Sequence, residues 1–121
     1  MRIFKNTWFS RFARKENISD EELRDTVDQL EAEQADANLG GDVYKIRLAR
    51  SGEGKSGGYR VVVFFKSEFR AFFIYGFAKS DRGNIDKGEL RAFKKDAKDQ
   101  LALTDEQLEA WLRSRTLIEV L

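Results

Sequence analysis

Apolar side chains recur at helical spacing near both ends of the chain. In residues 6–16 and 19–30 they stand three or four positions apart, and the same spacing returns in residues 86–101 and 104–112. Because residues at this spacing share one face of an α-helix, the pattern predicts four amphipathic helices. Three of these segments begin with pairs that can cap a helix N-terminus: Ser19 with Glu22, Asp86 with Glu89, and Thr104 with Gln107.

The central part of the chain has a period of two instead. Residues 44–48 alternate apolar and basic side chains, whereas residues 59–65 and 71–77 are rich in the β-branched and aromatic residues that favour strands. These three segments predict an antiparallel meander. Residues 2–4 and 117–120 are compatible with short edge strands.

Composition limits the chemistry that the chain can support. Its length is that of one domain, residues 1–121, and helices before and after the strands predict the α+β class. There are no cysteines and no histidines, which excludes disulfides, thiolate metal sites, and cysteine or histidine catalysis. We expect no metal and no cofactor.

The first fifteen residues lack a continuous apolar block. We therefore expect neither a secretory signal nor a membrane span, and we expect the protein to be cytoplasmic.

The segment Gly54-Lys55-Ser56 ends as a nucleotide-binding phosphate loop does. However, Ala49 stands where such a loop needs its first glycine, and the residues after Gly58 have the pattern of a strand rather than a helix. We therefore interpret the segment as a flexible hairpin connection, in which Lys55 can reach solvent or a ligand.

Positive charge is concentrated in the middle third of the chain. Residues 42–82 contain nine basic and four acidic side chains, whereas the net charge of the whole chain is +1. Alternation sends Lys45 and Arg47 to one face of their strand and Arg60 to one face of the next strand. If pairing brings Arg60 beside Arg47, two like charges meet, which destabilises a sheet unless something offsets the repulsion.

Two interpretations of this basic face remain open. In the first, an anion such as a nucleic-acid phosphate offsets the repulsion. Four further cations would then lie at the rim of the site: Arg50, Lys55, Lys79 and Arg82. In the second, the face is washed by solvent, and long basic side chains merely cover apolar rings.

Several short motifs resemble the central sheet of RelE/ParE-type bacterial toxins. They are, in order, Tyr44-Lys45-Ile46-Arg47-Leu48, Gly58-Tyr59-Arg60-Val61 and Gly76-Phe77-Ala78-Lys79. The fuller pattern is similar to a HigB-like branch of that family, and it adds Leu39-Gly40-Gly41, Gly54-Lys55-Ser56-Gly57, Tyr75, Asn84-Ile85 and Glu89-Leu90. The resemblance covers most of the chain.

This resemblance implies a fold and a function. The implied fold has N-terminal helices packed on one face of a small, curved antiparallel sheet of three to five strands, followed by C-terminal helices. The implied protein is the toxin of a type II toxin–antitoxin system, which cleaves messenger RNA on the ribosome and so inhibits translation. Its implied partner is a cognate antitoxin, often a helix-turn-helix protein encoded by the adjacent gene.

The same resemblance implies roles for single residues. Lys45 matches a lysine proposed to act in proton transfer, and Arg47 matches a basic position that contacts phosphate. Arg60 matches an arginine that stabilises the transition state. Lys79 and Arg82 fall in the basic segment after the last strand, where the family places another arginine.

Cleavage of RNA by its own 2′-hydroxyl needs a base, stabilisation of a doubly anionic phosphorane, and a proton for the leaving 5′-oxygen. The two strand arginines suit the second task, because guanidinium forks match phosphate oxygens. For the base we favour Lys45, since nearby cations and partial desolvation favour a neutral amine, with Tyr59 and Tyr75 as alternatives. The family's catalytic tyrosine has no counterpart, because gap-free spacing puts Asp86 at its position.

Two other functions remain open. One is a toxin of the same fold that binds and inhibits DNA gyrase, which would not need three cations at these positions. The other is a non-catalytic RNA-binding domain, which would bind RNA with strong salt dependence and leave it intact.

Overall fold

The computed structural model describes residues 1–50 and 54–121, with all their side chains except those of residues 50 and 54–57. The four predicted helices and the three central strands are confirmed within this part of the chain. The elements are, in chain order, β1 (Arg2–Asn6), α1 (Thr7–Lys15), α2 (Asp20–Glu31), β2 (Ala37–Asn38), β3 (Val43–Arg50), β4 (Gly54–Lys66), β5 (Arg70–Ala78), α3 (Lys87–Leu101), α4 (Asp105–Arg113) and β6 (Leu117–Val120).

The described strands form one mixed sheet of six, in the order β2-β3-β4-β5-β1-β6. The antiparallel meander β3-β4-β5 is as predicted. The prediction of a purely antiparallel sheet of three to five strands was wrong, because β1 inserts parallel to β5 and antiparallel to β6. It was also wrong to expect β1 at an edge, since hydrogen bonds to β5 on one side and β6 on the other satisfy its backbone.

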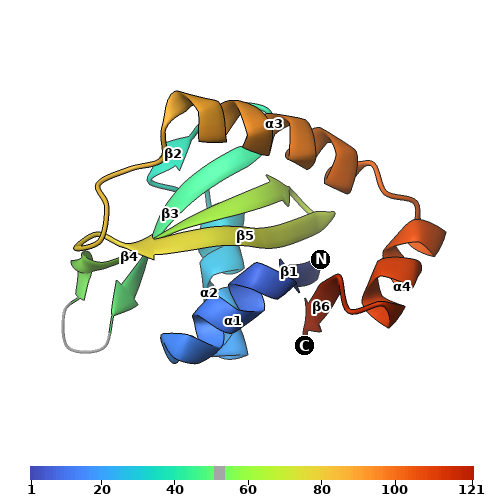
Figure 1. Cartoon of the computed structure of the whole chain (residues 1–121), viewed down its shortest axis with the longest axis horizontal. Helices are drawn as coiled ribbons and strands as arrows, with labels where there is room; N and C mark the ends of the chain where they lie inside the picture. Colours follow the sequence, from blue (N-terminus) through green and yellow to red (C-terminus); the bar gives the residue numbers. More distant parts are fainter. Residues whose placement is uncertain (51–53) are drawn as a thin grey trace.

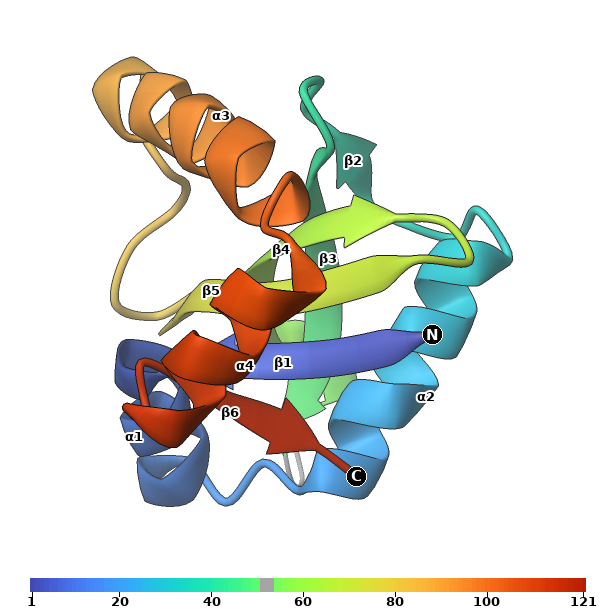
Figure 2. The ribbon, with the colours of Figure 1, turned by 90° about the vertical axis from the view of Figure 1, so that its right-hand side faces the viewer.

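Helices cover both faces of this sheet. The cluster on one face contains side chains of α1 and α2, whereas the cluster on the other face contains side chains of α3 and α4. Figures 1 and 2 show α2 and α3 on opposite sides of the strands. The expectation for the N-terminal helices is confirmed, and the C-terminal helices bury part of the second face. Among the described helices, none combines the length and apolar composition needed to cross a membrane.

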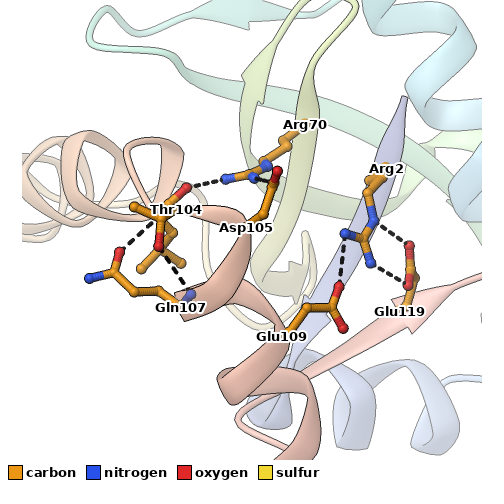
Figure 3. Close-up of polar contacts among 8 residues, drawn as sticks. Arg2, Arg70, Thr104, Asp105, Gln107, Glu109 and Glu119 are labelled. Atoms are coloured by element: carbon orange, nitrogen blue, oxygen red, sulfur yellow. Dashed lines mark hydrogen bonds and ion pairs between the residues drawn. The ribbon is translucent and has the colours of Figure 1, made fainter.

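Ion pairs attach α4 to β5 and β1, and a further ion pair joins β1 to β6 (Figure 3). Arg70 on β5 is almost fully buried and donates to Asp105 at 2.7 Å. Arg2 on β1 donates twice to Glu119 on β6, at 2.9 Å each, and once to Glu109 on α4 at 3.1 Å. These contacts hold the end of the chain against the inserted strand.

The glycine-rich segment belongs largely to a strand. The predicted hairpin is confirmed, because β3 and β4 pair antiparallel, but it was wrong to place Gly54-Lys55-Ser56 in its connection, because β4 begins at Gly54, opposite Arg50 on β3. The carbonyl of Gly58 accepts a hydrogen bond from the backbone of Lys79 at 3.2 Å, so β4 is paired on both sides. This pairing outweighs the weak strand preference of glycine. The side chains of Arg50 and Lys55, two of the predicted rim cations, lie outside the described residues.

Gly76 on β5 allows close packing of α1 on the sheet. A Cβ atom at this position would lie 2.6 Å from Cε2 of Phe12. We expect Gly76→Ala to lower the free energy of unfolding by about 1–3 kcal/mol, because the overpacked side chain must displace α1. Urea unfolding measures the change. Gly83→Ala is the matched control, since no atom lies within 4 Å of its added Cβ; equal loss in both variants would contradict the packing argument.

Candidate active site

The register of the meander brings the predicted cations to one face of the sheet. Arg47 on β3 lies directly opposite Arg60 on β4, and Arg60 lies opposite Phe77 on β5. Lys45 lies opposite Val62 in the adjacent row. Because directly opposed residues of antiparallel strands point to the same side, these side chains share a face. The row of Arg47, Arg60 and Phe77 lies beyond the cluster packed under α3 and α4.

Arg60 is a buried charge for which the described part of the chain offers no counterion. It is 7% exposed, and its buried Nη1 makes no hydrogen bond with any residue that the structure describes. Burying a guanidinium group costs several kcal/mol unless it is paired, and the positive charge of Arg47 opposite adds repulsion. The arrangement therefore favours an anion at this point of the sheet.

Arg47 is held by a carboxylate at the sheet edge. One Asp36 oxygen lies 3.3 Å from Nε of Arg47, and the other accepts a hydrogen bond from the backbone N–H of Arg47. Sequence analysis missed this partner, because no local pattern connects residue 36 with residue 47. The guanidinium group is about half-exposed, so its remaining donors can reach a ligand.

Lys45 and Lys79 flank the two arginines. The half-buried Lys45 donates from Nζ to Oδ1 of Asn84 at 3.2 Å, in the segment before α3. Lys79 is exposed just after β5, two residues beyond Phe77, and makes no ion pair with the described residues. By alternation it follows the side of Phe77 and Arg60.

Arg82 is engaged within the protein. Its guanidinium group donates to both Glu89 oxygens, at 3.0 and 2.6 Å, and to the Tyr75 hydroxyl at 3.3 Å. It also lies over the Phe77 ring at 5.4 Å. The structure thus places Arg82 against the site face but commits much of its donor capacity to α3.

This ion pair predicts a pH dependence of stability. Hydrogen bonds from Arg82 hold the pKa of Glu89 at about 2, below its ordinary value of 4.5. A depressed folded-state pKa adds stability above the unfolded value, and that stability is lost as the pH falls from 4.5 towards 2. We expect Glu89→Gln to be less stable than the parent at pH 7 and equally stable near pH 2. Urea midpoints across this range measure the difference. Asp96→Asn, an exposed change on the same helix, is the control. A difference in urea midpoint between Glu89→Gln and the parent that did not change with pH would contradict the ion-pair argument.

The two candidate tyrosines lie on opposite faces. Tyr75 is opposite Val62 on the cation face, and its hydroxyl oxygen accepts the hydrogen bond from Arg82. Tyr59 is buried on the other face, where its ring meets the Phe12 ring edge-on at 5.5 Å. Of the two, only Tyr75 can therefore reach a ligand bound at Arg60.

Asp86, at the position of the missing tyrosine, has a structural role. Its side chain accepts a hydrogen bond from the backbone of Glu89, and the Glu89 side chain accepts one from the backbone of Asp86. This reciprocal pair is the predicted capping box, and it starts α3.

The chemistry of the site rests on cations. Within the described residues, no group of three or more Asp, Glu, His or Cys side chains is arranged to hold a metal ion. Paired guanidinium groups can instead bind the non-bridging oxygens of a phosphate, and they remain charged as negative charge builds up in a transition state.

Comparison with known proteins agrees with this geometry. A family model described as the RelE toxin of the RelE / RelB toxin-antitoxin system matches residues 1–120, which include every element from β1 to β6. No curated protein matches the chain significantly. Since the family model spans the sheet, both helix layers and the cation row, the chain belongs to the RelE family of toxins from toxin–antitoxin systems.

Proposed function

We propose that this toxin is a metal-independent endoribonuclease that cuts messenger RNA on the ribosome. The observation that carries the proposal is the buried Arg60, which lies directly opposite Arg47 and whose Nη1 has no hydrogen-bond partner among the described residues. A scissile phosphate bound between them supplies the missing negative charge. A toxin that only bound gyrase would have no need of the repulsion between Arg47 and Arg60.

The proposed reaction assigns each task to one side chain. Lys45 takes the proton of the 2′-hydroxyl, whose oxygen bonds to phosphorus while the bond from phosphorus to the 5′-oxygen breaks. Arg47 and Arg60 bind the non-bridging oxygens of the phosphorane. Tyr75 donates a proton to the 5′-oxygen. Its oxygen already accepts from Arg82, which leaves its own O–H free to donate.

The remaining basic residues extend the site along the RNA. Lys79 is exposed beside the cation row and would bind a neighbouring phosphate, and Arg50 and Lys55 retain this role as proposals from the sequence. Arg82 would act chiefly by positioning Tyr75. Membership of the RelE family implies an antitoxin partner. We propose a helix-turn-helix protein encoded by the adjacent gene, and a HigB-like branch within the family.

Ribosomes programmed with a defined message test this function. Primer extension should reveal cuts in the message when protein and ribosomes are both present, and no cuts when either is omitted. Intact message combined with inhibited DNA supercoiling would identify a gyrase toxin instead. Message that is bound but never cut would identify a non-catalytic RNA-binding domain.

A further inference from the structure

An exposed indole lies beside the candidate active site. Trp8, in the first turn of α1, is 44% exposed, whereas the next residue, Phe9, is fully buried in the core. Two consecutive helical residues cannot both face the core, because they lie about 100° apart around the helix axis. The first turn is also fixed in place. Asn6 caps it by accepting from the Phe9 backbone at 2.7 Å and donates to the carbonyl of Ile74 on β5 at 3.1 Å.

Ring contacts connect this indole to the cation row. The centroid of Trp8 lies 4.7 Å from that of Tyr75, and Tyr75 lies 6.0 Å from Phe77. Phe77 is opposite Arg60 in the sheet. The guanidinium group of Arg82 lies 6.0 Å from the ring centroid of Tyr75 and 5.4 Å from that of Phe77. Trp8 is therefore the outer end of an aromatic path that begins at the proposed phosphate position.

The position of Trp8 differs from that of the other exposed apolar residues. Among the described residues these are Met1, Phe69 and Leu121. Met1 and Leu121 are chain ends, and Phe69 is at the β4–β5 turn, where Arg70 lies over its ring at 4.5 Å. Trp8 alone among the four contacts the candidate site. Trp8 also packs on Phe12 at 5.3 Å, yet almost half of its surface still faces solvent.

We propose that Trp8 stacks against an unpaired base of the RNA next to the scissile phosphate, which makes it a base-positioning residue. This inference rests on the proposed function of the same site. Other proteins bind single-stranded RNA with the same combination: basic side chains contact the backbone, and aromatic rings stack on the bases. Stacking tolerates any base, so Trp8 would hold the nucleotide in place without selecting its identity.

The experiment measures binding of an RNA hexamer with 2′-O-methyl riboses, which cannot be cut. Trp111→Phe leaves Trp8 as the single tryptophan, and its fluorescence should be quenched when the hexamer binds. Trp8→Ala should weaken binding on the order of tenfold, and Trp8→Phe should retain most of the affinity because a ring remains. A second hexamer, of equal charge but abasic at one position, completes a double-mutant cycle. If the abasic position is the one that stacks on Trp8, this hexamer should bind the parent and Trp8→Ala with equal affinity.

Controls separate stacking from other roles of Trp8. Phe69→Ala removes an aromatic ring of similar exposure, 42%, outside the site and should not change binding. Two results would overturn the stacking role. In the first, Trp8→Ala weakens binding of the intact hexamer and of the abasic hexamer equally, whichever position is abasic. In the second, Trp8→Ala weakens binding of neither hexamer. Loss of antitoxin co-purification with unchanged RNA affinity would overturn it in favour of a protein contact. If instead Arg60→Ala bound the hexamer as tightly as the parent, the phosphate role of Arg60 would fail whatever Trp8 does.

Discussion

Arg60→Met is expected to slow RNA cleavage by roughly 10²–10³-fold, the usual effect of removing one group that stabilises a transition-state anion. The same change should leave the free energy of unfolding unchanged or raise it. Arg60 is buried, faces Arg47 and has no partner in residues 1–50 and 54–121, so methionine of similar length removes a repulsive charge rather than a bond. Single-turnover cleavage of ribosome-bound message and urea unfolding measure the two effects.

Arg70→Met is the matched control for this prediction. Arg70 is also buried, at 3% exposure, but it donates to the carbonyl of Leu103 at 2.6 Å and to Asp105 at 2.7 Å. Its loss should lower the free energy of unfolding by about 1–3 kcal/mol, because a partly buried carbonyl loses its donor. Cleavage per folded molecule should be retained. If the two variants lost stability and activity alike, Arg60 would be a structural residue.

Phe4→Ala is expected to destabilise the protein by about 3–5 kcal/mol, the usual cost of removing a large ring from a closed core. Phe4 is fully buried and stacks on Phe72 with the ring centroids 5.2 Å apart. The cost is high because β1 lies between β5 and β6, so neither neighbour can move in to fill the cavity. Urea unfolding monitored by circular dichroism measures the change.

Phe69→Ala supplies the comparison within the same chain. Phe69 is 42% exposed and contacts mainly the cations of Arg70 and Lys66, so its removal should cost at most about 1 kcal/mol. A similar small cost for Phe4→Ala would show that β1 behaves as an exposed edge strand in solution. The inserted position of β1 would then be wrong.

Much of the local structure could be predicted from the sequence. Apolar spacing located all four helices, and the pairs Asp86 with Glu89 and Thr104 with Gln107 form the expected capping boxes. Alternation located the meander and placed Lys45 and Arg47 on one face. These features depend on residues a few positions apart, so the helical or strand period records them directly.

The pairing partners of the site could not be predicted in this way. No local pattern singles out Asp36, yet its carboxylate lies against the guanidinium group of Arg47. Trp8 falls within the helical apolar spacing of residues 6–16, yet its ring lies against Tyr75 on β5. Each contact joins segments that are far apart in the chain, and no local pattern encodes such a distance.

By itself, the sequence determined the helices, the central strands, the absence of cysteine and histidine chemistry, and the excess of cations in the middle third. Only the tertiary structure decided that β1 enters the sheet beside β5, that helices cover both faces, and that Arg60 is buried opposite Arg47 with no counterion among the residues that the structure describes. The physical reason is that periodicity reports which side of an element is buried. Strand order and ion pairing depend on which distant surfaces bury the most apolar area together.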